Sequence, residues 1–179
     1  MKRRQFIKTS IAITGTIVGV GGGTFLLIDE TNKSDLKIAS ALKKLELLSN
    51  KIFFKTGEWE VNKIFAHCAQ SVELSMTEFP EHKSILFKNT IGKLAFSLFS
   101  SKGKMTHGLS EPIPGSPSID QNLDTTVALN HLTKVLIDFE NYKGELAPHF
   151  AYGKLSKSEY EIAHVMHLYN HLQEVKVKL

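Results

Sequence analysis

Apolar residues recur at intervals of three and four along five stretches of the chain, and this spacing places them on one face of an α-helix. Polar segments, or segments that contain glycine and proline, separate the stretches. The pattern predicts helices over about residues 36–50, 58–76, 84–100, 125–141 and 156–175. No segment shows sustained alternation of apolar and polar residues, so no strand is predicted.

Residues typical of helix ends support these boundaries. Ser34 and Asp124 can cap the first and fourth helices, because a short polar side chain accepts hydrogen bonds from free N–H groups at a helix start. Ser156, followed three residues later by Glu159, is a capping box before the last helix. The third helix has an apolar face made of Phe87, Ile91, Leu94, Ala95 and Leu98.

A long connection lies between the third and fourth helices. Residues 101–123 contain three prolines and three glycines and have no usable periodicity. A loop of this length inside a compact domain is usually functional. The chain is therefore predicted to be an all-α bundle, in which four main helices and a C-terminal one are joined with one long cross-connection.

Residues 1–28 differ from the rest of the chain, because a basic start is followed from Ile11 to Ile28 by a run without any charged residue. Such a segment is typical of an export signal. The run Arg3-Arg4-Gln5-Phe6-Ile7-Lys8 resembles a twin-arginine signal, although Lys2 stands where that pattern usually has Ser or Thr. An ordinary secretory signal and an uncleaved anchor are the alternatives.

No clear small-x-small cleavage site follows Ile28, so the segment could also stay as a membrane anchor whose basic start remains in the cytoplasm. These features predict an exported protein of the periplasm or cell envelope, either released or anchored in the inner membrane. Residues 29–35 are then a polar linker, and residues 36–179 are the helical domain.

The net charge of +4 comes from the leader, which holds four of the 22 lysines and arginines and none of the 18 acidic residues. The rest of the chain is balanced, and this removes the electrostatic argument for nucleic-acid binding. The single cysteine, Cys68, cannot form an internal disulfide, and its apolar neighbours predict a buried thiol.

Histidines on two predicted helices are the main candidates for chemistry. His167 and His171 lie four residues apart on the last helix, so both imidazoles can point at one place, and His164 lies on the same stripe. His67, at the edge of the apolar face of the second helix, can supply a third ring. Three protein ligands with an open position are typical of catalytic zinc sites. The alternative is a solvated helix flank, because two histidines four apart also occur by chance.

Four segments resemble an uncharacterised, domain-of-unknown-function branch of the DinB/YfiT-like superfamily. They are Ile64-Phe65-Ala66-His67-Cys68-Ala69-Gln70-Ser71, Glu111-Pro112-Ile113-Pro114-Gly115, Pro148-His149-Phe150-Ala151-Tyr152-Gly153-Lys154-Leu155 and His167-Leu168-Tyr169-Asn170-His171-Leu172. The resemblance covers most of the chain from Leu36 onward. It implies a four-helix bundle of DinB-like type, in which one histidine of the second helix and a His-x-x-x-His pair on the last helix bind a divalent metal, commonly zinc or nickel.

By this resemblance His67, His167 and His171 are the metal ligands. Three further residues are expected as substitute ligands or as groups that surround the ligands, and they are His164, His149 and Asn170. Relatives often carry a further histidine at the position of Asn170. The remaining histidines are interpreted as ordinary surface or loop residues, and they are His82, His107 and His131.

A metal held by three neutral histidines acts as a Lewis acid and, as zinc does in carbonic anhydrase, lowers the pKa of its bound water to about 7. The chain is therefore predicted to be a metal-dependent hydrolase or transferase with a small-molecule substrate, and Gln70 is a candidate for orienting the bound water or the substrate. One alternative is a non-enzymatic bundle that stores or senses metal or binds a partner. Another is a bundle whose histidines bind nothing. The sequence leaves the substrate, the metal and the oligomeric state open, a homodimer included.

Overall fold

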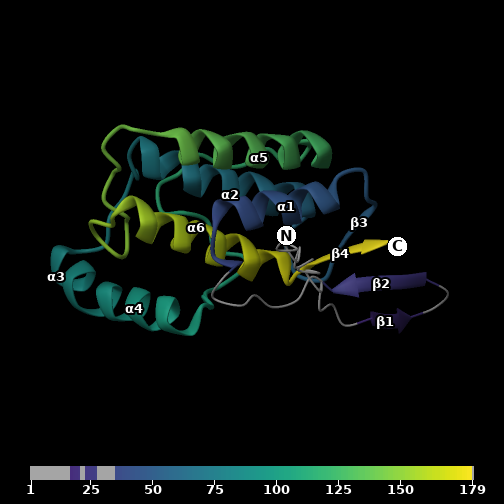
Figure 1. Cartoon of the computed structure of the whole chain (residues 1–179), viewed down its shortest axis with the longest axis horizontal. Helices are drawn as coiled ribbons and strands as arrows, with labels where there is room; N and C mark the ends of the chain where they lie inside the picture. The colour runs from purple at the N-terminus through teal and green to yellow at the C-terminus, as the bar shows by residue number, and fades with distance from the viewer. Residues whose placement is uncertain (1–16, 21–22, 28–34, 179) are drawn as a thin grey trace, which may run out of the picture.

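The computed structural model describes residues 17–20, 23–27 and 35–178, and these residues form a mostly helical protein (Figure 1). All five predicted stretches are helical. They correspond to α1 (Ile38–Leu48), α2 (Val61–Met76), α3 (Ile85–Phe87) with η2 (Lys88–Gly92) and α4 (Lys93–Lys102), α5 (Thr125–Asn141) and α6 (Lys157–Leu172). The third stretch runs through a π-helical turn, η2, between α3 and α4.

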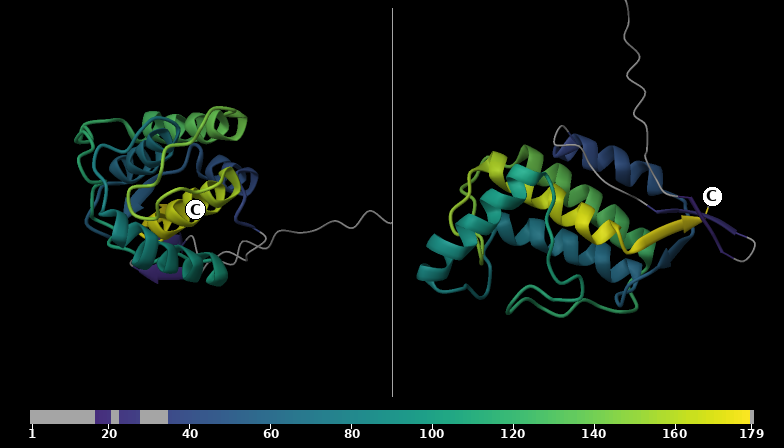
Figure 2. Two further views of the ribbon diagram at one scale, coloured as in Figure 1. Left: turned by 90° about the vertical axis from the view of Figure 1, so that its left-hand side faces the viewer. Right: turned by 90° about the horizontal axis from the view of Figure 1, so that it is seen from below.

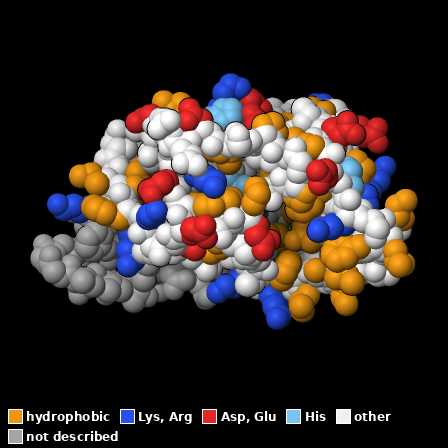
Figure 3. Space-filling model, turned by 180° about the vertical axis from the view of Figure 1, so that it is seen from behind, with side chains coloured by type: hydrophobic (Ala, Val, Ile, Leu, Met, Phe, Trp, Pro, Cys, Tyr) orange, Lys and Arg blue, Asp and Glu red, His pale blue; other side chains and the backbone are white. Residues whose placement is uncertain are grey.

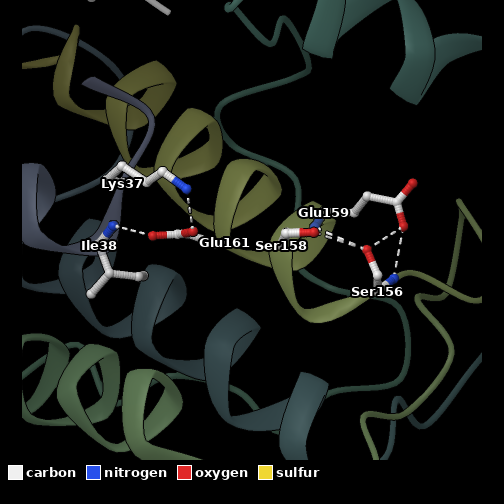
Figure 4. A network of polar contacts seen from close by, with 6 residues as sticks. All are labelled: Lys37, Ile38, Ser156, Ser158, Glu159 and Glu161. Carbon is white, nitrogen blue, oxygen red and sulfur yellow. Dashed lines mark hydrogen bonds and ion pairs between the residues drawn. The ribbon is translucent and has the colours of Figure 1, made fainter. Parts of the chain in front are cut away.

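Two of the predicted caps are present. Asp124 accepts hydrogen bonds from the backbone N–H groups of Thr126 and Val127 at 2.8 and 3.0 Å. Ser156 and Glu159 form the capping box at the start of α6, where the Glu159 carboxylate accepts from the Ser156 N–H at 2.7 Å (Figure 4).

The start of α1 is held by another helix. Ser34 lies outside the described residues, and the residue at the N-cap is Lys37, whose side chain makes no capping bond. Glu161 on α6 instead accepts a hydrogen bond from the Ile38 N–H at 3.0 Å and pairs with the Lys37 ammonium at 3.0 Å (Figure 4). A carboxylate at a helix N-terminus also interacts favourably with the helix dipole, so this contact fixes α1 against α6.

Helices α1, α2, α5 and α6 pack around one core, with α2 against both α5 and α6 (Figures 1 and 2). Their apolar stripes meet there, and fully buried residues come from α2 (Ile64, Phe65), α5 (Leu132, Leu136) and α6 (Leu168). Cys68 on α2 is buried in this core, as predicted. Burial raises the pKa of its thiol well above the ordinary value, so the thiol is not a ready nucleophile.

The prediction that the chain has no strands was wrong. Strands β1 (Ile17–Val20), β2 (Gly23–Leu27), β3 (Phe53–Lys55) and β4 (Val175–Lys178) form an antiparallel sheet in the order β1-β2-β4-β3. The last helix ends at Leu172, not at 175. In β4 the buried Val175 and Val177 alternate with lysines over only four residues, which is too short to stand out as a sequence pattern.

Strands β1 and β2 fall within the stretch predicted as the leader. The basic start at residues 1–16 and the linker residues 29–34 lie outside the described residues. Among the residues that are described, no helix combines the length and the apolar character needed to span a membrane.

The apolar face expected for the third helix is largely exposed. Ile91, Leu94 and Leu98 are 59, 73 and 48% exposed, while Phe96 is buried. A π-helical turn contains one more residue than an α-turn, so η2 rotates the helical stripe away from the core. Apolar side chains gather at the end of the molecule where α3 and α4 lie (Figure 3).

The long connection between α4 and α5 is fastened to α2 (Figure 2). Near the start of α2, Asn62 Nδ2 donates to the carbonyl oxygens of Gln121 and Leu123 at 3.0 and 2.7 Å. Two turns later, Gln70 Nε2 donates to the Pro117 carbonyl at 3.0 Å. These bonds lay the connection along the helix that carries His67.

Candidate metal centre

His67 on α2 and His167 and His171 on α6 meet in the interior, and we call these three residues the triad. Nε2 of His167 lies 3.1 Å from Nε2 of His67 and 3.1 Å from Nε2 of His171. One ligand atom from each ring lies within 4.8 Å of the others. The one-turn spacing of His167 and His171 and the packing of α2 on α6 therefore bring together the three rings singled out in the sequence.

Hydrogen bonds between the rings cannot satisfy all three Nε2 atoms. Each nitrogen of a neutral imidazole offers either one N–H or one lone pair in the ring plane. His167 Nε2 can therefore make one N–H···N bond, to His67 or to His171, but not both. In the other contact the third nitrogen would either face a like group or compete for the same N–H or lone pair, and buried polar atoms without partners are costly. A cation between the three nitrogens would satisfy all of them at once.

Burial, reinforced by neighbouring groups, favours the neutral form of the triad rings. Burial, followed by the nearby His107 and Lys63, lowers the pKa of His67 from 6.5 to about 4. Burial, followed by His67 and His107, lowers the pKa of His171 to about 2. The pKa of His167 is also held well below its ordinary value, first by burial and then by the neighbouring His171 and His67. Neutral imidazole is the form that binds a metal, so the rings are ready as ligands at neutral pH.

Trp59, just before α2, packs against the triad and was not singled out in the sequence. Its ring is stacked on His171 at 5.9 Å between centroids and meets the edge of His67 at 5.0 Å. The indole is only 5% exposed and lies under the Lys63 ammonium. It closes one side of the centre with an apolar surface. Trp59 precedes the helix, outside its periodic pattern, so the sequence did not indicate that it packs against the triad.

His107 was interpreted as an ordinary loop residue, and the structure corrects this. The long connection places its ring 5.0 Å from His167 and 5.1 Å from His171, between centroids. Its Nδ1 lies 2.8 Å from the Gly108 carbonyl, and its Nε2 is buried without a hydrogen-bond partner among the described residues. Sequence reasoning missed His107 because it stands in a segment without periodicity.

A cavity of about 370 Å³ opens beside the triad. His67 and His167 form part of its wall, and His107 and Ile113 from the long connection form another part. The turn after α5, at residues 149–152, contributes a further part. Gly92 allows this turn to approach the helix, because a Cβ at Gly92 would lie 2.0 Å from the Ala151 carbonyl oxygen. The triad therefore borders a space large enough for a small molecule.

A family model described as "Protein of unknown function (DUF1569)" matches residues 31–178. The chain belongs to the DUF1569 family. No curated protein and no solved structure gives a significant match. The match to the DUF1569 model includes every residue of the triad, Trp59, His107 and the cavity wall.

In this DUF1569 domain His149 and His164 line the same cavity but are bonded elsewhere. His149 Nδ1 accepts hydrogen bonds from the backbone N–H groups of Ala151 and Tyr152 at 3.1 and 3.2 Å. His164 Nε2 lies 3.0 Å from Ser75 Oγ, which itself donates to the Val72 carbonyl, so His164 Nε2 is the donor. Burial lowers the pKa of both rings to about 3. Both rings thus have hydrogen-bond partners within the protein, and burial favours their neutral form.

The remaining candidates, Gln70 and Asn170, lie on the same two helices as the triad. Gln70 Oε1 accepts from Ser116 Oγ at 3.1 Å, and with its bond to Pro117 the whole amide is engaged with the long connection. Its orienting role stays a prediction. Asn170 is buried on α6, and its Nδ2 has no hydrogen-bond partner among the described residues. His82 and His131 are exposed, and His131 pairs with Glu73 at 3.0 Å.

Proposed function

We propose that the chain binds one divalent metal ion at the triad and uses it as a hydrolase or transferase acting on a small molecule in the adjoining cavity. The observation that carries the proposal is the convergence of three Nε2 atoms that hydrogen bonds between the rings cannot satisfy. The cavity supports an enzyme, because catalytic zinc sites keep one position open for water or substrate.

The separations from His167 fit the ion. Two nitrogens bound to a tetrahedral zinc at 2.0–2.1 Å lie about 3.3 Å apart, and two at right angles in an octahedral site lie roughly 3.0 Å apart. His167 Nε2 lies 3.1 Å from each of the other two Nε2 atoms, between these values, and one ligand atom from each ring lies within 4.8 Å of the others. Imidazole suits both zinc and nickel, and these are the proposed metals. The bound ion would supply a Lewis acid and a means of activating water at neutral pH.

Side chains in the cavity wall would bind and orient the substrate. His149 Nδ1 is taken up as an acceptor, so its proton resides on Nε2, and the neutral ring is a hydrogen-bond donor. Lys83 adds a cation to the wall and Ser71 adds a hydroxyl one turn after His67. These groups favour a substrate with acceptor oxygens. The balanced charge of the domain favours a small molecule over a nucleic acid.

The fold type and the location are part of the same proposal. We assign the helices to a four-helix bundle of DinB-like type, supported by the mutual packing of α1, α2, α5 and α6 and by the histidine positions on α2 and α6. The basic, twin-arginine-like start and the uncharged run to Ile28 support export to the periplasm or cell envelope, with membrane contact where the segment is retained. A homodimer is compatible with this assignment.

Elemental analysis of the full chain, purified without a histidine tag, tests the metal site. We expect about one equivalent of zinc, nickel or another divalent transition metal in the parent, and none in the His67→Ala and His171→Ala variants. His131→Ala removes an exposed histidine and serves as the matched control, so it should keep the metal. A metal-free parent that also fails to bind added zinc or nickel would overturn the proposal. If the parent holds metal, its activity on hydrolase and thiol-transfer substrates can be screened, with the His171→Ala variant as the negative control.

A non-enzymatic metal-binding module is the second candidate, favoured by the position of His107 beside the triad. Structural zinc sites usually have four protein ligands. Azide added to the cobalt-substituted protein separates the two candidates. A changed visible spectrum indicates a position open to outside ligands, as an enzyme needs, and an unchanged spectrum indicates a closed site.

A further inference from the structure

The long connection brings a fourth imidazole to the centre. The three triad rings lie 4.8–4.9 Å from one another between centroids. His107 lies 5.0 and 5.1 Å from His167 and His171, which is nearly the same spacing. The three triad nitrogens alone fall within 4.8 Å of one another, so His107 is the outermost of the four rings.

The tautomer of His107 suits a metal ligand. A carbonyl oxygen can only accept, so the 2.8 Å contact with the Gly108 carbonyl places the proton on Nδ1. Nε2 then carries a lone pair, and it is the buried ring nitrogen without a hydrogen-bond partner among the described residues. Metal-bound histidines commonly donate their other N–H to a backbone carbonyl in this way. All four rings would thus use Nε2.

The segment that carries His107 can supply this ring without disturbing the helices. Met105 and Ile113 are each 5% exposed and fix the connection to the core on either side of His107. Most residues between these two positions are exposed. The ring therefore comes from a short surface segment between two buried residues, whereas the triad rings come from packed helices.

We propose that His107 is a fourth metal ligand, supplied by the long connection to the ion held by the triad. The inference rests on the proposed metal site. It assigns a specific task to the connection, which is to supply the last imidazole from the cavity wall, where His107 lies. A centre that keeps four imidazoles would favour the non-enzymatic module, and an enzyme would require His107 to give up its position to water or substrate.

The fluorescence of Trp59 can report metal binding at the triad. Trp59 is the single tryptophan, and its ring lies 5.0 and 5.9 Å from the rings of His67 and His171. Added Ni²⁺ or Co²⁺ should quench its fluorescence on binding. Titrations of the full-length parent, His107→Gln and the control His131→Gln give the dissociation constants, and X-ray absorption of the zinc-loaded proteins counts the bound imidazoles.

We expect four imidazoles in the parent and in His131→Gln, and three in His107→Gln. We also expect His107→Gln to bind the metal at least about tenfold more weakly, since even losing a partner outside the ligand set costs about 10–100-fold. Three imidazoles in the parent, or equal dissociation constants and imidazole counts in parent and His107→Gln, would overturn the inference and leave the triad site intact. A parent that binds no metal would remove the triad site itself, so the two failures are distinguishable. The number of imidazoles bound to zinc in the parent tests the inference even where the His107→Gln variant folds poorly.

Discussion

The triad and the pair formed by His149 and His164 both bury neutral imidazoles, yet they differ in what their nitrogens meet. His149 accepts two backbone N–H groups, and His164 donates to Ser75. Both rings of the pair also pack against aromatic rings, His149 on Tyr152 and His164 on Tyr160. Each ring of the pair therefore has protein partners of its own.

In the triad the rings also have an aromatic neighbour, Trp59, but their Nε2 atoms have no hydrogen-bond partner of their own outside the triad among the described residues. The Nε2 atoms of His67, His167 and His171 face one another, and Nδ1 of His67 and of His171 is buried without a hydrogen-bond partner among the described residues. Burial alone therefore does not mark a histidine as a ligand. Convergence of nitrogens that the protein leaves unsatisfied is what distinguishes the triad from the pair, and the comparison predicts different responses to metal and to mutation.

The largest difference is expected in stabilisation by metal. A ligand that binds only the folded state at about 1,000 times its dissociation constant adds about 4 kcal/mol to the free energy of unfolding. For a chain of this size that corresponds to a rise in melting temperature on the order of 10 °C. We expect His171→Gln to abolish the rise caused by zinc and His164→Gln to keep it, as measured by thermal unfolding with zinc and with EDTA. Equal loss in both variants would show that the pair belongs to the metal site.

The sequence allowed the triad to be predicted because its signal is local. Four-residue spacing on one helix places His167 and His171 together, and His67 lies at the edge of the stripe that packs against that helix. The caps at Asp124 and Ser156 were predictable for the same reason, since a cap depends on residues two or three positions away. Such features need no knowledge of the tertiary structure.

The features that were missed depend on distant contacts. His164 shares the stripe of His167 and His171, but its partner is Ser75 on another helix, which spacing cannot reveal. His107 reaches the triad through an irregular connection held by Gln70. Strand β4 exists because it pairs with β2 and β3, and its four residues are too few to show a pattern. Each of these required the packed chain.

An intermediate effect is expected in acid. Burial lowers the pKa of His164 to about 3, whereas an unfolded histidine titrates near 6.5. The unfolded state therefore binds more protons between these values, and the stability contributed by the neutral ring is lost as pH falls from about 6.5 toward 3. At pH 5 the loss is about 2 kcal/mol. In EDTA, where metal does not compete, urea unfolding at pH 8 and pH 5 should show at least this loss in the parent, because burial also lowers the pKa of His149 and of the triad rings.

His164→Gln should lose about 2 kcal/mol less than the parent over the same pH interval, because its amide does not titrate. His131→Gln, at an exposed position, is the matched control and should follow the parent. If His164→Gln and the parent respond to acid equally, His164 is not held neutral by burial, and the pair would no longer share this property with the triad.

The smallest effect is expected from Ser75→Ala, which removes the hydrogen-bond partner of His164 and makes one ring of the pair resemble the triad. Ser75 is fully buried, so no solvent can readily replace its hydroxyl at His164 Nε2. An unpaired buried N–H costs about 1 kcal/mol or somewhat more. We expect the free energy of unfolding to fall by that amount with and without zinc, because Ser75 does not contact the triad nitrogens. Urea unfolding with and without zinc measures this fall in the free energy of unfolding. Ser71→Ala is the matched control, because Ser71 is a serine on the same helix that lines the cavity and makes no hydrogen bond to His164. A fall that appears only with zinc would mean that Ser75 and His164 support the metal centre, and the two groups of histidines would then be one network.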